Sequence, residues 1–264
     1  MSLTVVLLVI AILFVSTCVR STLGFGDALL AMPLLAMAVG IRTATPLVAF
    51  VASTIALAIL LGNWRRVDLQ ATGHLILSTL LGIPVGLYFL KSAPEHAVKA
   101  ILGGLLVLFG LYSLLAPRFF QIAAANSTRK NFPTAGQPMP LPGPGIARGM
   151  LAYLFGFVAG ILGGAYNTNG PPIVIYGSLR RWAPDRFRAT LQGYFFPTGL
   201  LILAGHGLSG LWTPQVFRLY ACSLPGILLA IYLGGKLNGR IPAGRFERYV
   251  YLALVAFGVV LVLG

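Results

Sequence analysis

Long hydrophobic runs alternate with short polar gaps along almost the whole chain. Ten runs stand out, at residues 3–19, 22–40, 45–61, 72–90, 97–116, 149–163, 171–179, 189–204, 216–235 and 249–263. Several approach the roughly 20 apolar residues that a helix needs to cross the hydrocarbon core of a bilayer. The pattern therefore predicts an all-α membrane protein with about ten hydrophobic segments.

The composition supports this prediction. Of the 264 residues, 58% are hydrophobic and only 9% are charged, whereas a soluble domain carries about a quarter charged residues. The net charge of +14 would suggest nucleic acid in a soluble protein. Here the basic residues lie between apolar runs, where they contact lipid headgroups and set orientation. We expect the lipid bilayer as a partner, and no nucleic acid.

The basic residues are distributed unevenly among the gaps. All of the 19 Lys and Arg except Arg42, Lys91, Lys99 and Arg218 fall in the gaps that follow odd-numbered runs. Cytoplasmic loops carry the excess of Lys and Arg in membrane proteins. The pattern therefore predicts that both termini lie outside the cytoplasm. The first apolar run has no basic residue before it, which favours a retained segment over a cleaved signal peptide.

One long polar stretch, rich in Pro and Gly, divides the chain. It covers residues 117–148 and separates a first transmembrane repeat, 1–116, from a second, 149–264; the charge pattern makes it a cytoplasmic linker. The halves match weakly, with "GLYFLKSAP" at 86–94 aligned on "GGKLNGRIP" at 234–242. Two repeats with an odd number of segments insert in opposite orientations, so the sequence predicts two inverted five-segment repeats.

Each half has an interruption rich in glycine and proline near its start. The first reads "STLGFGDALLAMP" at 21–33, and the second reads "LGGAYNTNGPP" at 162–172. Such interruptions at corresponding positions are the best sequence indication of a binding site near the middle of the membrane. Each is either the tip of a re-entrant hairpin or a loop between two full crossings. The charge pattern is compatible with both, and the shortness of 171–179 favours the hairpin.

The second interruption has the composition of an anion site. Glycine allows the backbone to approach a ligand, and the two prolines suit the first turn of a new helix. A helix N-terminus with free N–H groups attracts anions. We therefore predict that Asn167, Thr168, Asn169 and Gly170 bind the substrate, with neutral side-chain donors. The alternative is that Asn169 or Thr168 only caps a helix in an ordinary loop.

In the first interruption, Gly24 and Gly26 are expected to bring matching donors from the opposite side, helped by Ser21 or Thr22. Asp27 is unusual because a charge near the middle of the membrane is costly. Three roles are open for it: a helix N-cap, an ion pair with Arg20 that shapes the site, or a proton carrier. Arg20, Gly24, Gly26 and Asp27 complete the predicted substrate site together with Gln192, a lesser candidate in the following segment of the second half.

The remaining polar residues give no sign of catalysis. The three histidines and two cysteines show no metal-ligand spacing, and the chain has no catalytic Ser/His/Asp group, paired carboxylates or phosphate-binding loop. We therefore predict no enzyme activity, no cofactor and no metal site. Tyr194 is interpreted as a packing residue.

Two stretches of the second half resemble a known family. "GGAYNTNGPPIVIYGSLRRWAPDRFRATLQGYF" at 163–195 is similar to the second-half signature of the sulfite exporter TauE/SafE family. "LGGKLNGRIPAGRFERYV" at 233–250 is similar to the closing motif of that family. The first half matches less well, because "GFGDALLAMPLL" stands where many members have a run of three glycines before the proline.

The resemblance implies a carrier of sulfite, sulfonates or related organosulfur anions in a bacterial cytoplasmic (inner) membrane. An oxyanion of this kind has three acceptor oxygens, which fit clustered amide donors. We expect a secondary transporter that works by alternating access. The alternatives are a passive anion channel or a transporter of a carboxylate without sulfur. The specific anion, the direction of transport, the coupling ion (proton or sodium) and the oligomeric state stay open.

Overall fold

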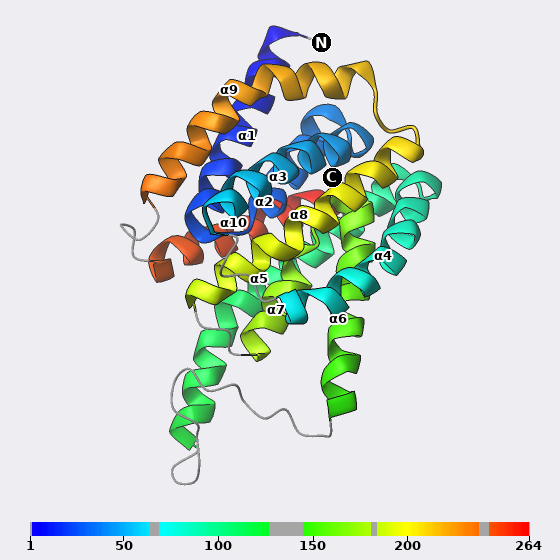
Figure 1. Ribbon diagram of the computed structural model, residues 1–264. Coiled ribbons are helices and arrows are strands. Elements are labelled where there is room, and N and C mark those ends of the chain that lie inside the picture. The colour runs from blue at the N-terminus through cyan, green and yellow to red at the C-terminus, as the bar shows by residue number, and fades with distance from the viewer. Residues whose placement is uncertain (1, 64–68, 127–144, 181–183, 238–242, 264) are drawn as a thin grey trace.

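The computed structural model describes residues 2–63, 69–126, 145–180, 184–237 and 243–263, and all regular secondary structure within them is helical (Figure 1). The helices are α1 (Leu3–Leu23), α2 (Asp27–Val39), α3 (Ile41–Asn63), α4 (Leu69–Ser92), α5 (Glu95–Asn126), α6 (Gly145–Tyr166), α7 (Gly170–Leu179), α8 (Pro184–Leu208), α9 (Pro214–Leu237) and α10 (Ala243–Leu263). Each helix corresponds to one of the ten predicted segments, so the all-α prediction is confirmed.

The helices differ in their ability to cross a membrane. Among the described residues, five are long and apolar enough, and these lie in α1, α3, α4, α5 and α9. Helices α2 and α7 are much shorter, with 13 and 10 residues. At 1.5 Å per residue they extend about 20 and 15 Å, less than the roughly 30 Å of the hydrocarbon core. The two short helices are the ones that follow the two interruptions.

Glycine allows the longest helix pairs to pack closely. A Cβ on Gly82 or Gly86 of α4 would collide with the backbone of α6, and a Cβ on Gly160 of α6 would collide with that of α4. Gly103 and Gly258 have the same role between α5 and α10. Small residues permit this close approach in membranes, where lipid removes most of the hydrophobic drive for helices to associate.

The helices of the two halves interlock. Helix α4 of the first half packs along α6 of the second, α9 of the second half packs along α1 of the first, and α3 and α8 pack against each other. The first turns of α2, from Asp27 to Pro33, are buried, and so are Pro171, Pro172 and Ile173 at the start of α7. Helices α5 and α6 extend together from one end of the molecule (Figure 1). The breaks before α2 and α7 therefore lie inside the bundle.

The structure places the first break differently from the prediction. The apolar run was expected to begin at residue 22, but α1 continues through Leu23 and α2 begins at Asp27. The reason is local, because Gly24 and Gly26 both have positive φ and the backbone leaves the helix only at these glycines. In addition, α5 continues to Asn126 and α6 begins at Gly145, so both helices extend into the 117–148 segment.

Candidate functional site

The break between α1 and α2 is made by two glycines. Gly24 has φ 92° and its N–H donates to the carbonyl of Arg20 at 2.6 Å, which closes α1. Gly26 has φ 100° and stands at the N-cap of α2. Side chains other than glycine rarely adopt such a backbone because the Cβ would meet the following carbonyl. The chain therefore reverses direction within three residues and brings the ends of both helices together.

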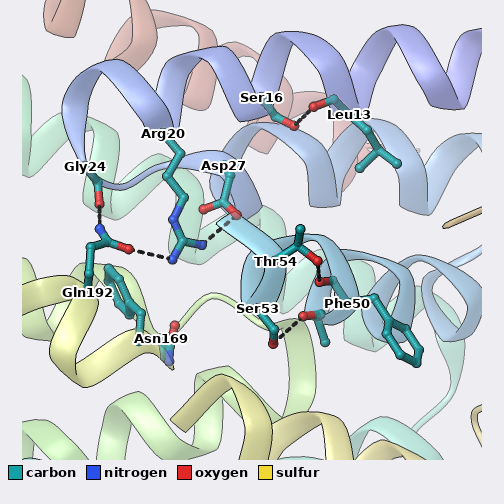
Figure 2. A network of polar contacts seen from close by, with 12 residues as sticks. Leu13, Ser16, Arg20, Gly24, Asp27, Phe50, Ser53, Thr54, Asn169 and Gln192 are labelled. Carbon is teal, nitrogen blue, oxygen red and sulfur yellow. Dashed lines mark hydrogen bonds and ion pairs between the residues drawn. The ribbon is translucent and has the colours of Figure 1, made fainter. Parts of the chain in front are cut away.

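A buried ion pair spans this break. Arg20 Nη1 donates to Asp27 Oδ2 at 2.9 Å, and both residues are buried, with exposed fractions of 3% and 6%. Arg20 Nη2 donates to Gln192 Oε1 at 3.1 Å, and Gln192 Nε2 donates to the carbonyl of Gly24 at 2.5 Å (Figure 2). The guanidinium carbon lies 5.1 Å from the centre of the Phe195 ring. Arg20 is thus held by a carboxylate, an amide and an aromatic face.

This geometry decides among the structural roles considered for Asp27. The N-cap position belongs to Gly26 and no side chain makes a cap hydrogen bond there, so the N-cap interpretation is wrong. The predicted pairing of Asp27 with Arg20 is present. A buried charge without such a partner would carry a large desolvation cost. The pair lets the protein keep a guanidinium inside the bundle.

One predicted donor of the first break lies elsewhere. The hydroxyl of Thr22 donates to the carbonyl of Cys18 at 2.8 Å and contacts the carbonyl of Gly234 at 3.4 Å. Gly234 belongs to α9 and packs against Ser21 so closely that a Cβ there would collide with that side chain. Thr22 therefore belongs to the interface between α1 and α9, where its hydroxyl is already engaged, and its role as a substrate donor stays a prediction.

The break between α6 and α7 consists of residues with polar side chains, Asn167, Thr168 and Asn169. Asn167 has φ 53°, the one positive φ at a residue other than glycine in the described chain. Its N–H donates to the carbonyl of Gly163 at 2.8 Å, and that of Thr168 donates to the carbonyl of Leu162 at 3.2 Å. Asn, with its short polar side chain, tolerates this conformation better than most residues. Asn167, Thr168 and Asn169 are all buried.

The start of α7 offers fewer backbone donors than an ordinary helix. Pro171 and Pro172, in the first turn as predicted, have no N–H. The N–H groups of Asn167 and Thr168 bond to α6. Those of Asn169 and Gly170 stand at the start of α7, where a helix leaves its N–H groups without an intrahelical partner. An anion here would depend on the amide and hydroxyl side chains as well as on the helix N-terminus.

Asn169 occupies the N-cap position of α7 without acting as a cap. Its side chain makes no cap hydrogen bond, and its Nδ2 instead donates to the hydroxyl oxygen of Thr198 on α8 at 3.3 Å. The alternative interpretation of Asn169 as a simple helix cap is therefore wrong. Thr198 in turn donates to the carbonyl of Tyr194 at 2.7 Å.

The two breaks meet at one small cavity. Seven of the nine predicted site residues line it: Arg20, Gly26, Asp27, Asn167, Thr168, Asn169 and Gly170. Its volume is about 20 Å³, room for about one water molecule. Gly24 and Gln192 do not line the cavity, and they are connected to it through Arg20. Figure 2 shows Asn169 on the side of the cavity opposite the first break, with Arg20 and Asp27 facing it across the space.

Several residues of this cavity were not predicted from the sequence. Phe195 and Gly199 of α8, Ala52 of α3 and Leu29 of α2 also line it. Gln192, Phe195 and Gly199 are spaced i, i+3, i+7, which places them on one helix face. Because Gln192 marks the face of α8 that is directed toward the site, Phe195 and Gly199 could have been predicted from their positions on the same face. Ala52 and Leu29 carry no chemical signal.

The site shows no means of holding a metal. In the part of the chain that the structure describes, no three His, Cys, Asp or Glu side chains lie close enough together to bind an ion. The ionisable groups at the cavity are one arginine and one aspartate, already paired with each other. The remaining polar groups are amides and a hydroxyl, which bind an oxyanion through hydrogen bonds.

In the part of the chain that the structure describes, ten helices enclose a polar cavity and five of them are long and apolar enough to cross a bilayer, which indicates a multi-pass membrane protein. A family model for "Sulfite exporter TauE/SafE" matches residues 8–261, nearly the whole chain. The chain therefore belongs to the sulfite exporter TauE/SafE family, a family of membrane transporters, and the recognition made from the sequence is confirmed. No curated protein and no solved structure matches the chain.

Proposed function

We propose that this protein is a secondary transporter that carries a small sulfur-containing oxyanion, such as sulfite or a sulfonate, by alternating access. The cavity in which the two helix breaks meet carries the proposal. One break contributes a guanidinium and the other contributes two amides and a hydroxyl, all buried. The three oxygens of a sulfite or sulfonate need several donors at once, and a guanidinium supplies charge-assisted ones. The family supplies the sulfur specificity.

The charges favour a guanidinium that is shared between Asp27 and the substrate. The ion pair at rest is electrically neutral, so it does not repel an anion as a free carboxylate would. Arg20 Nε is buried and has no hydrogen-bond partner among the residues that the structure describes. A substrate oxygen could satisfy this donor while Nη1 stays on Asp27. Asn167, Thr168 and Asn169 would complete the site with donors that bring no further charge.

The size of the cavity supports a carrier over a permanently open channel. At about 20 Å³ it holds about one water molecule and is smaller than a sulfonate with its donors in contact. Binding therefore requires the breaks to move apart, as they would when one bundle rocks against the other. A passive channel would need a continuous wet path past the same residues.

The packing pattern supports two structurally related halves, as an inverted repeat requires. Each helix of α1–α5 can be matched with the helix at the same position in α6–α10. Under this match, the packed pair α4 and α6 corresponds to α9 and α1, which also pack together. The packed pair α4 and α8 likewise corresponds to α9 and α3, which are also in contact. The pairs α3 with α8 and α5 with α10 convert into themselves. Two related halves would place α2 and α7 as short, half-crossing helices whose tips meet near the midplane of the cytoplasmic membrane.

Counterflow in proteoliposomes tests the function. Vesicles loaded with unlabelled sulfite should accumulate labelled sulfite transiently above its external concentration, since a carrier exchanges one substrate for another and a channel cannot. Sulfate and acetate serve as competitors for the sulfur and carboxylate classes. Equilibration without overshoot would indicate a channel, and the absence of sulfite-dependent flux would overturn the proposal.

A further inference from the structure

A large apolar groove opens beside the polar cavity. Its volume is about 440 Å³, and it lies between α5, α6 and α7, with α2 at its inner end. Almost all of its lining is hydrocarbon, for example Leu105 and Phe109 of α5, Val158 of α6 and Ile175 of α7. The outer rim includes the exposed side chains of Leu108 and Leu154. Apart from Thr168 at the inner end, the only lining side chain with a polar group in the described residues is that of Tyr112.

The inner end of the groove is a wall of the polar cavity. Leu29, Thr168 and Pro171 line both spaces. Thr168 is one of the residues proposed to hold the anion, Leu29 is two residues after Asp27 and Pro171 follows Gly170, so the wall between the two spaces adjoins the anion site. These three shared residues separate the two spaces. A molecule with its charged end on Arg20 and Asn169 would enter the groove with its other end when they move aside, as the breaks must do to admit a substrate.

The groove also marks a difference between the two halves. Helix α2 packs on α10, and exchanging the halves converts this pair into α7 and α5. In the described residues, α7 and α5 are not among the well-packed pairs. The groove occupies the space between them. The groove thus lies beside the second break, the one that carries the three polar side chains.

Size and chemistry indicate the occupant. A dry cavity of about 150 Å³ binds benzene, so the groove has room for a ring or a chain of several carbons. Binding sites for organic ligands combine a mostly apolar lining with a few convergent polar groups. The geometry points to an amphiphilic organic anion as the substrate of this protein: an oxyanion head in the cavity of Arg20 and Asn169, and an apolar alkyl or aryl body in the groove. This inference rests on the proposed transport function.

A series of alkanesulfonates tests the inference. Purified protein is titrated with sulfite and with methane-, butane-, hexane- and octanesulfonate, and the same compounds compete for counterflow in proteoliposomes. Each methylene that enters the groove should tighten binding about two- to fourfold, until the groove is full. Benzenesulfonate should bind with much higher affinity than methanesulfonate. Alkyl alcohols of the same lengths control for partition into the membrane and should give no comparable competition.

Two groove variants and one control test whether the alkyl part of the substrate lies in the groove. Val158→Trp and, separately, Leu154→Trp fill the groove from α6 and should flatten the dependence on chain length while leaving sulfite and methanesulfonate unchanged. Leu229→Trp places the same ring on an exposed position of α9 and should leave the whole series unchanged. Asn169→Ala should weaken every member of the series by a similar factor, because it acts on the head.

The outcomes separate the inference from the function on which it rests. If sulfite and methanesulfonate bind but longer chains gain nothing, the inference fails and the transporter stands; a groove filled by a phospholipid acyl chain would give this result. A chain-length dependence that survives both tryptophan variants would also overturn the inference. If no anion of any length binds or competes, the proposed function itself fails.

Discussion

The two helix breaks follow the first helix of each half, yet they differ in how the backbone turns and in where the polar groups lie. The first uses glycine at 24 and 26 to turn the backbone, and places its polarity on the flanking ion pair of Arg20 and Asp27. The second turns at Asn167 with φ 53° and places its polarity on the turn itself. One break thus contributes charge that is compensated internally, and the other contributes neutral donors.

This difference suggests a division of roles around one anion. A charge inside a membrane protein must be paired to be tolerated, so the guanidinium comes with its own carboxylate. Gln192 accepts a second hydrogen bond from the guanidinium and helps to hold it in place. Amides cost less to bury and can be placed directly in the turn. The guanidinium would attract the anion by its charge, and the amides would select its shape through directed hydrogen bonds. Variants at the two breaks should therefore fail in different ways.

Removing the guanidinium should have the largest effect. Arg20→Ala leaves Asp27 buried without its partner, which costs about 3–5 kcal/mol of folding free energy, and it also removes the positive charge from the cavity. We expect a strong fall in thermal stability in detergent and no measurable counterflow. Differential scanning fluorimetry and sulfite counterflow measure the two effects.

A double variant separates stability from binding at this break. Arg20→Ala combined with Asp27→Ala removes both charges and should regain part of the lost stability while transport stays absent. Recovery of transport in the double variant would show that the guanidinium does not contact the substrate.

Removing one amide from the second break should affect binding more than stability. Asn167→Gly keeps the positive φ accessible and deletes only the side chain. Because a hydrogen bond to a charged group contributes about 1.5–3 kcal/mol, we expect sulfite to bind roughly ten- to a hundredfold more weakly. The free energy of unfolding should change by less than about 1 kcal/mol. Isothermal titration and thermal unfolding compare the two quantities.

Asn167→Ala provides the contrast, because it deletes the same amide and adds backbone strain of about 1–2 kcal/mol. If the glycine variant transports normally and only the alanine variant fails, Asn167 serves the turn and not the anion, and the two breaks would be more alike than proposed.

The sequence predicted the positions of both breaks better than their internal geometry. The apolar runs and the polar residues between them located ten segments and most of the cavity lining, because burial in a membrane demands strongly apolar helices. The sequence did not reveal that Asn169 binds Thr198 instead of capping α7, or that Gln192 accepts a hydrogen bond from Arg20. Such contacts depend on how α8 is placed by tertiary packing, which no local pattern records. Phe195 and Gly199 were within reach through their spacing from Gln192.

A smaller effect is expected from adding one methyl group to the glycine turn. Gly26→Ala meets no close neighbour, since the nearest atom to the added Cβ lies 3.9 Å away, but the φ of 100° is unfavourable for alanine. We expect a loss of about 1–2 kcal/mol in stability, read from denaturant unfolding. Gly104→Ala is the matched control, because it lies within α5 with open space around it. That variant should be neutral or stabilise the helix by about 0.5–1 kcal/mol. Equal behaviour of the two variants would contradict a strained turn at Gly26.

The smallest effect concerns the pH dependence of transport. If Asp27 serves only as the counter-charge of Arg20, Asp27→Asn should lower stability and rate but leave the shape of the pH profile as in the wild type, since Asn can still accept a hydrogen bond from the guanidinium. Methanesulfonate counterflow between about pH 5 and 8 measures the profile, because this substrate stays ionised throughout. A profile that flattens or shifts in the variant would make Asp27 the proton carrier. In that case the first break would supply the coupling ion as well as the charge, and the second break alone would define the shape of the anion site.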